Sequence, residues 1–398
     1  MVICCQLRTA PRRIWASAGT DARAGCGATL RVQATPLQYG AAAVPSRAGR
    51  LAAAAAQLRR PGAALAGCGG TKAGARAQQW SARLGQRALS EGPKHPNIGR
   101  FSSDLGDQFI NNFGEPFVTF RVMDEHGGVL HPSLEPDVSQ EEAVRMYKTM
   151  VQLTVMDSIL YEAQRQGRLS FYMTNYGEEA THIGSASVLK SEDVIYGQYR
   201  EAGVLLWRGF TLQEAVDQCV GNIDSSDRGR MMPVHYGSKR LNFHTISSPL
   251  ATQLPQAAGA AYALKLQNKD ACVVCYFGDG AASEGDFHGA LNFAATLECP
   301  VIFFCRNNGY AISTPIREQY RGDGIAVRGV SYNIKTARCD GNDTWAVHHV
   351  MKKAREIAVK EKIPVLVEAM TYRGGHHSTS DDASRYRGTD ELNSWFTT

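Results

Sequence analysis

Long apolar runs are missing from this sequence. The longest candidates are short uncharged stretches such as 272–277 and 301–305, whereas a membrane-spanning helix needs about 18 consecutive apolar residues. The sequence therefore excludes a membrane span. Hydrophobic residues make up 43% and charged residues 20% of the chain, which is typical of globular proteins and excludes a chain that is disordered, collagen-like or coiled-coil as a whole.

Acidic residues are nearly absent from the first 94 positions, which hold 14 Lys and Arg against Asp21 and Glu91. The remaining 304 residues carry a net charge of −7, so the overall +5 reflects the leader and not a basic face. Non-specific nucleic-acid binding is therefore excluded. An Arg-rich, acid-poor leader is typical of an organelle transit peptide, which predicts that residues 1–94 are a cleaved mitochondrial leader. The alternatives are a retained disordered extension and a misassigned start of translation.

Metal-binding cysteine spacing is also missing. Four of the ten cysteines lie in the leader (Cys4, Cys5, Cys26 and Cys68), and the others are scattered. Cys272 and Cys275 form a C-V-V-C sequence, but it lies within an apolar strand. We therefore predict buried, reduced thiols here and no zinc or redox pair.

What is present beyond the leader is an alternating pattern of strands and helices. Residues 95–140 are turn-rich and predict an extended N-terminal arm, and apolar spacing predicts a long helix at 141–166. Strands are predicted at 194–196, 271–277, 301–305 and 365–370, and further helices at 178–189, 212–219, 252–266, 284–296 and 345–360. The alternation favours an α/β fold in three α/β/α layers, with helices on both faces of a parallel sheet. Residues 141–398 are assigned to this domain.

Two strand-end loops carry the residues of a diphosphate and metal site. The predicted strand at 271–277 is followed by Gly278-Asp279-Gly280, and the strand at 301–305 by Arg306-Asn307-Asn308. Glycines let backbone amides approach a phosphate, and carboxylate and amide oxygens are ligands that Mg²⁺ prefers. Gly-Asp-Gly alone would equally fit a tight turn before a helix. The 26 residues between Gly280 and Asn307 suffice for one helix and one strand, which return the second loop beside the first.

This pairing resembles the thiamine-diphosphate fingerprint, Gly-Asp-Gly followed about 24 to 27 residues later by Asn-Asn. Longer matches lie at 172–179 (YMTNYGEE), 197–203 (GQYREAG), 247–253 (SSPLATQ), 307–315 (NNGYAISTP) and 376–382 (HHSTSDD). From 171 to about 395 the sequence is similar to the alpha chains of the branched-chain 2-oxo acid dehydrogenase decarboxylases. The resemblance implies a thiamine-diphosphate-binding fold.

The resemblance also implies roles for individual residues. Asp279, Asn308 and the carbonyl of Tyr310 would bind Mg²⁺, with Gly280 and Ala281 alongside, and many chains of this branch have Glu where Asp279 stands. The residues that would contact the diphosphate are Gln198, Tyr199, Arg200, Arg306 and His377, of which His377 is also the catalytic candidate. Leu250, Ser248 and Ile312 would border the aminopyrimidine and the substrate.

Two segments have a simple structural interpretation beside the one that the family implies. Residues 247–253 fit a Ser/Pro turn that caps a helix, whereas the resemblance implies a K⁺ site formed by Ser247, Pro249, Thr252 and Gln253. Residues 372–387 fit a mobile surface loop, whereas the resemblance implies a phosphorylation loop in which Ser378 is modified. Phosphate there would repel Asp381 and Asp382 and inactivate the enzyme.

The implied function is oxidative decarboxylation of branched-chain 2-oxo acids in the mitochondrial matrix, with the acyl group passed to a lipoyl group on a transacylase. The implied partners are a beta subunit in an alpha2-beta2 heterotetramer, the transacylase core, and a regulatory kinase and phosphatase. The glutamate that activates the cofactor belongs to the beta chain, and Glu178 and Glu179 are assigned to the helix dipole. The family pattern stops near Trp395, which predicts a C-terminal truncation. The alternatives are a pyruvate or acetoin dehydrogenase alpha chain and a truncated subunit without catalytic activity.

Overall fold

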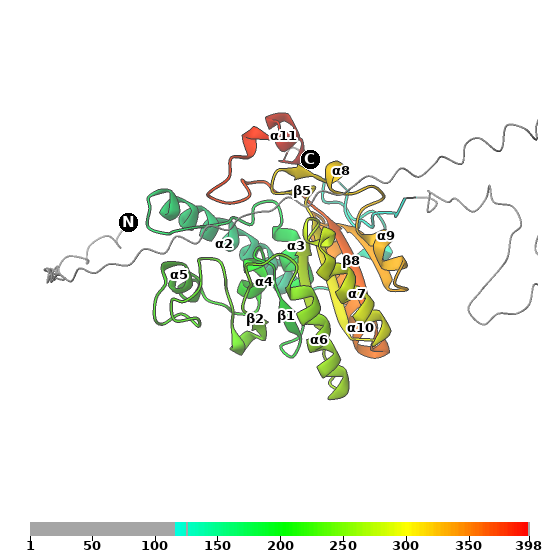
Figure 1. Ribbon diagram of the computed structural model, residues 1–398. Helices are drawn as coiled ribbons and strands as arrows, with labels where there is room; N and C mark the ends of the chain where they lie inside the picture. The colour runs from blue at the N-terminus through cyan, green and yellow to red at the C-terminus, as the bar shows by residue number, and fades with distance from the viewer. Residues whose placement is uncertain (1–115, 125, 397–398) are drawn as a thin grey trace, which may run out of the picture. The chain divides into compact units, whose positions relative to one another are not determined.

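The computed structural model describes residues 116–124 and 126–396 (Figure 1). The predicted leader and the first part of the predicted arm lie outside the described residues. The rest of the arm contains a short 3-10 helix, η3 (Pro132–Leu134), and a bridge between Phe120 and Cys339. The arm therefore pairs with an edge of the sheet described next.

A six-stranded parallel sheet forms the centre of the fold, which confirms the predicted fold class. Its order is β2-β1-β3-β4-β8-β7, and every neighbouring pair is parallel. The strands are β1 (Val194–Tyr196), β2 (Phe243–His244), β3 (Val273–Gly278), β4 (Val301–Asn307), β7 (Lys335–Asp340) and β8 (Val365–Met370). Two of these strands were not predicted, because β2 has only two residues and β7 lies at the sheet edge and lacks an apolar run.

Helices cover both faces of the sheet. The helices α2 (Gln140–Arg165), α3 (Glu179–Ala186), α4 (Ala202–Trp207) and α10 (Thr344–Glu361) pack together on one face, and α6 (Gln253–Leu266), α7 (Gly285–Thr296) and α9 (Ala326–Val330) on the other. Successive residues of the strands enter opposite cores: Val365 and Val367 join the first and Leu366 the second. Strands that are buried on both faces are typical of parallel sheets between helix layers.

The predicted helices are present to within three residues at each end. The remaining α-helices of the described residues are α5 (Leu212–Val220), which was predicted, and α8 (Ile316–Gln319) and α11 (Thr389–Phe396), which, like α4 and α9, were not. A small hairpin joins β5 (Tyr310–Ala311) to β6 (Thr314–Pro315). Local capping explains several boundaries. Ser139 caps α2, Thr211 and Glu214 form a capping box on α5, and Asp343 caps α10. Each cap satisfies backbone N–H groups that the helix itself leaves without a partner.

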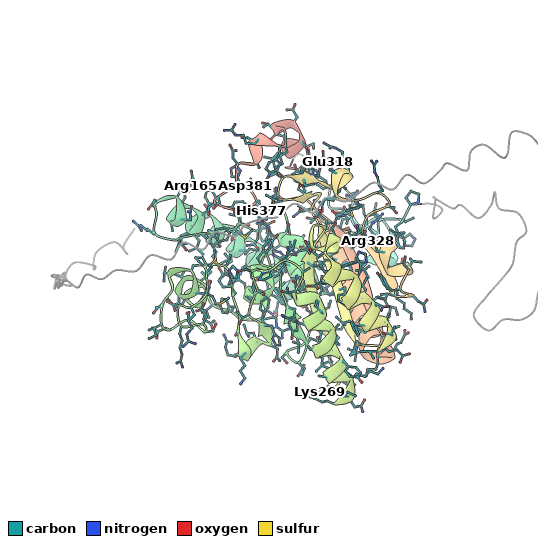
Figure 2. All side chains as sticks on the ribbon, in the orientation of Figure 1. Arg165, Lys269, Glu318, Arg328, His377 and Asp381 are labelled. Atoms are coloured by element: carbon teal, nitrogen blue, oxygen red, sulfur yellow. The ribbon has the colours of Figure 1, made fainter. Side chains whose placement is uncertain are left out.

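The strand order places a crevice at the carboxyl ends of β1 and β3. After β1 the chain crosses to β2 at one edge of the sheet, and α6 then returns it to β3 on the other side of β1. Ligands of open α/β sheets bind at such a reversal of strand order. His377 and Asp381 lie at this end of the molecule, and Lys269, which precedes β3, lies at the opposite end (Figure 2).

Two further predictions bear on the described residues. Cys272 and Cys275 are fully buried and free of disulfides, and burial raises the pKa of both thiols well above the usual value, so the prediction of reduced core cysteines is confirmed. No helix in the described part of the chain is long and apolar enough to cross a bilayer.

Candidate active site

A cavity of about 270 Å³ lies at the carboxyl ends of β1, β3, β4 and β8. Its walls come from the ends of these strands and the loops that follow them, from Leu250 in the segment between β2 and α6, and from the β5–β6 hairpin. The sequence-predicted residues that line it are Gln198, Tyr199, Arg200, Leu250, Asp279, Gly280, Ala281, Arg306, Asn308, Tyr310, Ile312 and His377. The cavity is therefore built from segments that are up to 179 residues apart in the sequence, His377 and Gln198 being the extremes.

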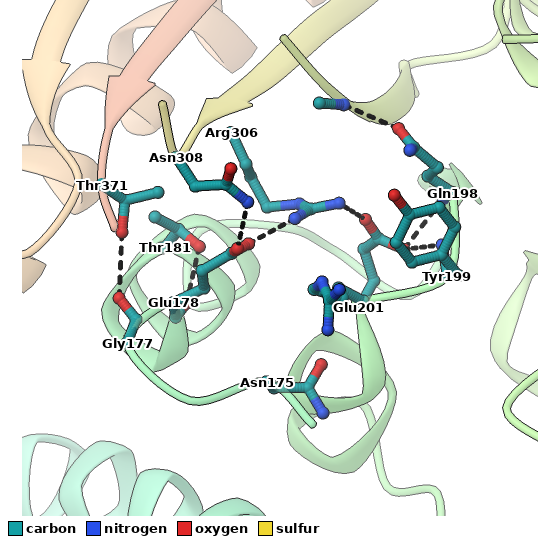
Figure 3. Close-up of polar contacts among 12 residues, drawn as sticks. Asn175, Gly177, Glu178, Thr181, Gln198, Tyr199, Glu201, Arg306, Asn308 and Thr371 are labelled. Atoms are coloured by element: carbon teal, nitrogen blue, oxygen red, sulfur yellow. Dashed lines mark hydrogen bonds and ion pairs between the residues drawn. The ribbon is translucent and has the colours of Figure 1, made fainter. Parts of the chain in front are cut away.

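Behind the cavity, one arginine connects two glutamates. Arg306, near the end of β4, binds Glu178 through Nη1 and donates from Nη2 to Oε1 of Glu201 at 2.5 Å (Figure 3). All three side chains are almost completely buried. Burial opposes the charge of Arg306, but the two carboxylates outweigh this and raise its pKa above the usual value. The charge of Arg306 is therefore matched within the protein, and only its Nε lacks a hydrogen-bond partner.

Glu178 also reaches the second asparagine of the Asn-Asn pair. Its Oε1 accepts a hydrogen bond of 2.7 Å from Nδ2 of Asn308. Although Glu178 is the N-cap residue of α3, its side chain makes no capping hydrogen bond and instead binds Arg306 and Asn308, so the helix dipole alone does not account for it. Burial raises the pKa of Glu178, but Arg306, Arg200 and Asn308 together lower it below the usual value.

The loop after β1 is ordered by Glu201. Oε2 of this residue accepts hydrogen bonds from the backbone N–H groups of Gln198 at 2.8 Å and Tyr199 at 2.9 Å. Oε1 of Gln198 in turn accepts from the N–H of Gly278 at 2.6 Å. These contacts fix the loop after β1, which carries the predicted diphosphate ligands Gln198 and Tyr199, against Gly278 at the end of β3.

Two buried arginines on the cavity have no carboxylate partner among the residues that the structure describes. Arg200 donates to the carbonyl oxygens of Thr174 and His377, and Arg373 donates to the carbonyl of Ile312 and the hydroxyl of Tyr386. Each is 2% exposed. Burial, together with the nearby Arg200, lowers the pKa of Arg373. Buried charges are normally paired, so a cavity with two such guanidiniums fits an anionic group such as a diphosphate.

Asp279 supplies a carboxylate to the lining of this cavity. Its Oδ2 accepts from Nε2 of Gln319 at 2.8 Å, and burial raises its pKa to about 6. In the described part of the chain, no group of three or more His, Cys, Asp or Glu side chains could hold a metal ion by itself. A cation here would therefore need Asp279 together with amide, carbonyl and phosphate oxygens, which is how Mg²⁺ is commonly held beside phosphates.

His377 lies over the cavity on the loop after β8. Its Nε2 is 3.5 Å from the hydroxyl of Tyr199, and burial, Arg200 and Arg373 lower its pKa to about 3, so the ring is neutral near pH 7. Its backbone N–H donates to Oδ2 of Asp381 at 2.7 Å. Ser378 beside it is only 7% exposed. The loop is thus packed through specific hydrogen bonds and is not a featureless surface segment.

The predicted K⁺ ligands lie next to the cavity and not in its wall. Oγ1 of Thr252 is 3.3 Å from Oγ of Ser247 and donates to the carbonyl of Pro249 at 3.2 Å. Nε2 of Gln253 donates to the carbonyl of Tyr276. Ser248, which was predicted to border the substrate, does not line this cavity and instead bonds to Nε2 of His235 at 2.7 Å. Oxygens of Ser247, Pro249 and Thr252 therefore gather at one turn, whereas the Gln253 amide is directed to Tyr276 in β3.

Sequence reasoning missed Arg373 and Glu201 and misjudged Glu178. Arg373 follows the end of β8 by three residues, and this position at a strand end is a signal that could have identified it. Glu178 and Glu201 gave no such signal, because an acid at a helix start has an ordinary explanation. Their role depends on Arg306, which is more than 100 positions away in the sequence.

Comparison with known proteins agrees with this geometry. Residues 147–398 match the family model described as "Dehydrogenase E1 component". The chain is 57% identical over 308 residues to the mouse protein "2-oxoisovalerate dehydrogenase subunit alpha, mitochondrial", covering 77% of this chain and 70% of that protein. Proteins of the same name from chimpanzee and Dictyostelium discoideum are 55% identical over 338 residues (85% of this chain and 74% of that protein) and 60% identical over 277 residues (69% and 63%). The chain belongs to the dehydrogenase E1 component family.

Proposed function

We propose that this chain is the alpha subunit of a thiamine-diphosphate-dependent decarboxylase component that acts on branched-chain 2-oxo acids. The family is thiamine-diphosphate-dependent, and the named relatives are alpha subunits of 2-oxoisovalerate dehydrogenase. The observation that carries the proposal is the pair of buried arginines without carboxylate partners, Arg200 and Arg373, in a cavity that also contains Asp279 and Asn308. The overall reaction is an oxidative decarboxylation with a lipoyl disulfide as acceptor.

In this proposal some residues of the chain anchor the cofactor and others orient it. Arg200 and Arg373 neutralise the diphosphate, and the neutral donors Gln198 and Tyr199, together with the Nε–H of the charged Arg306, add hydrogen bonds. His377 is neutral and donates one further hydrogen bond near the reacting groups. When bound, thiamine diphosphate supplies a carbanion that adds to the keto carbon and a ring that accepts the electrons released with CO₂.

Divalent and monovalent cations complete the proposed site. Asp279, Asn308 and the carbonyl of Tyr310 bind Mg²⁺ beside the diphosphate, with Gly280 and Ala281 next to it. A Cβ at Gly280 would approach Cβ of Ala311 to 2.8 Å, so a side chain at that position would force the hairpin away. The turn that brings Ser247, Pro249, Thr252 and Gln253 together binds K⁺ and orders the cofactor loop.

The substrate side chain meets apolar residues at the rim. Leu250 and Ile312 line the cavity and are 41% and 52% exposed, so both are free to contact a branched aliphatic group. Ile312 has φ = 56°, a left-handed conformation that is strained for a β-branched residue. Its carbonyl is held by Arg373, which links the substrate wall to the diphosphate anchor.

The proposal extends to assembly, regulation and location. A beta subunit completes the site and supplies the glutamate that activates the cofactor, so that this chain alone has no activity. Phosphate on Ser378 would add about −1.5 to −2 charges next to Asp381, which accepts hydrogen bonds from the N–H of His377 and the hydroxyl of Tyr386. Repulsion there disorders the loop and lowers activity. The proposed location is the mitochondrial matrix, and the proposed further partners are the lipoyl-bearing transacylase, a kinase and a phosphatase.

Turnover by the alpha chain co-expressed with its beta subunit tests the substrate assignment. We expect 3-methyl-2-oxobutanoate to be oxidised with a higher kcat/KM than pyruvate, in a reaction that requires thiamine diphosphate. A preference for pyruvate would favour the pyruvate or acetoin branch. Cofactor binding without turnover of either acid would favour the non-catalytic subunit.

A further inference from the structure

The orientation of the Asn308 amide is fixed from both ends. Nδ2 donates to Oε1 of Glu178 at 2.7 Å (Figure 3). Oδ1 accepts from the N–H of Tyr310 at 3.2 Å. Asn308 is 7% exposed and Glu178 is fully buried. An ionised carboxylate is an acceptor only, so Glu178 can bind the NH₂ side of the amide but not its oxygen. Oδ1 therefore points away from Glu178.

The neighbouring Asn307 is held in the same manner, but by a different buried glutamate. Nδ2 of Asn307 donates to Oε1 of Glu368 at 2.8 Å, and its Oδ1 accepts from the N–H of Gly309. Asn307 does not line the cavity, whereas Asn308 does. Each asparagine of the pair thus has its own buried glutamate, and only the Glu178 contact bears on the cavity.

Glu178 is itself held in place by Arg306. Its two oxygens are divided, with Oε1 bound to Asn308 and Oε2 to Nη1 of Arg306. An asparagine amide has nearly the same shape when its oxygen and nitrogen are exchanged, so packing alone does not select one orientation. The acceptor-only carboxylate selects it, and Oδ1 keeps a second lone pair beyond the one used by Tyr310.

We propose that Glu178 is a positioning residue for the divalent-cation site, which holds the Asn308 amide so that Oδ1 and not Nδ2 is presented to the cation. The inference rests on the proposed function, because it takes Asn308 as a cation ligand. Glu178 does not touch the cation in this arrangement. Its effect passes through the orientation of a ligand, as is common for groups that hydrogen-bond to metal ligands.

The first test is Glu178→Gln in the alpha chain co-expressed with its beta subunit. Mn²⁺ is titrated in the presence of thiamine diphosphate, and free Mn²⁺ is followed by electron paramagnetic resonance. Glutamine can donate to Oδ1 of Asn308 and so stabilise the reversed amide. We expect Mn²⁺ affinity to fall about 10- to 100-fold, the range typical of losing such a partner.

The matched control is Glu368→Gln. This change also replaces a buried carboxylate that binds an asparagine of the pair, since Oε1 of Glu368 accepts from Nδ2 of Asn307, but Asn307 does not line the cavity. If Glu178 acts through the Asn308 amide, Mn²⁺ affinity in Glu368→Gln stays close to that of the wild type. If loss of either buried carboxylate beside the pair weakens binding alike, the inference is overturned.

A pair exchange gives a second test, which also applies if Glu178→Gln fails to co-purify with the beta subunit. In Asn308→Asp a second carboxylate faces Glu178, and we expect weak Mn²⁺ binding. In the double variant with Glu178→Gln, the glutamine NH₂ donates to one oxygen of the new aspartate. The other oxygen of that aspartate is again directed to the cation. We expect the double variant to bind Mn²⁺ more tightly than Asn308→Asp alone, and equal or weaker binding overturns the inference.

Failure of this inference is distinct from failure of the proposed function. The wild type and Asn308→Ala are measured in the same series. Absence of cofactor-dependent Mn²⁺ binding in the wild type, or wild-type binding by Asn308→Ala, would overturn the cation assignment in the proposed function and this inference with it. Binding that is lost in Asn308→Ala but unchanged in Glu178→Gln would overturn only the role of Glu178.

Discussion

The cavity brings together arginines of two kinds. Arg306 binds Glu178 and Glu201, so its charge is matched within the chain. Arg200 and Arg373 are buried to a similar extent, yet they donate only to carbonyl and hydroxyl oxygens. The same residue type therefore serves two functions at this cavity. Arg306 fixes the protein loops to one another. Arg200, which interacts with Glu178 only at longer range, and Arg373 form no ion pair among the described residues and can bind an anionic ligand.

This comparison also bears on the predicted role of Arg306. The resemblance assigned the diphosphate to Arg200 and Arg306 as the two guanidiniums. The structure retains Arg306 on the cavity but gives its two Nη groups to glutamates, and only Nε remains without a partner. Arg373, which was not predicted, supplies the second unmatched charge.

The largest expected effect comes from removing the matched arginine. Arg306→Met leaves two buried carboxylates without their cation, and removing one partner of a buried ion pair costs about 3–5 kcal/mol. We expect the free energy of unfolding of the cofactor-free protein to fall by that amount, measured by denaturant titration. An unchanged unfolding midpoint would show that Arg306 does not hold the protein loops together. It would contradict the distinction between Arg306 and the two arginines without ion pairs.

The next effect comes from removing an unmatched arginine. In Arg373→Met we expect thiamine diphosphate to bind about 10- to 100-fold more weakly, since hydrogen bonds to charged groups contribute about 1.5–3 kcal/mol. The stability of the cofactor-free protein should be maintained, because no ion pair is broken. Calorimetry gives the affinity. Arg145→Met is the control, because Arg145 also donates to a backbone carbonyl, that of Trp207, but does not line the cavity.

A smaller effect is expected from a negative charge on the loop that covers the arginines. Ser378→Glu places a carboxylate beside Asp381 in a buried position, and we expect cofactor affinity to fall about tenfold, equivalent to one lost hydrogen bond. Limited proteolysis should cut the variant faster within residues 372–387. Ser380→Glu puts the same charge on an exposed neighbour and should bind the cofactor like the wild type. Equal losses in the two variants would contradict a role for the specific position of Ser378.

The smallest effect is a pH dependence caused by His377. Burial and the two unmatched arginines lower its pKa to about 3, so in mildly acidic solution the unfolded chain binds a proton that the folded chain does not. The stability that the folded chain has with a neutral His377 is fully present above pH 6.5 and is lost as the pH falls toward 3. We expect the wild type to lose about 1 kcal/mol more than His377→Asn between pH 6.5 and 5.5. If the free energies of unfolding of the cofactor-free wild type and of His377→Asn change with pH in parallel, the arginines do not lower the pKa of His377.

The sequence predicted the parallel sheet and most of the cavity because those features follow local patterns. Short apolar strands such as β4, and glycines and asparagines directly after them, are visible in a few consecutive residues. The edge strand β7 escaped prediction because its sequence, Lys-Thr-Ala-Arg-Cys-Asp, has no apolar run. Glu178 was misjudged because its partners Arg306 and Asn308 lie about 130 positions away. Such charge matching depends on tertiary contacts, which no local pattern encodes.

The most direct test of the account is a calorimetric titration of thiamine diphosphate with Mg²⁺ and K⁺ into the alpha chain co-expressed with its beta subunit. The wild type is compared with Asn308→Ala and Arg373→Met. The account predicts saturable binding by the wild type, loss of binding in Asn308→Ala and weaker binding in Arg373→Met. Absence of binding by a wild-type chain that co-purifies with the beta subunit would contradict the claim that this cavity holds the cofactor.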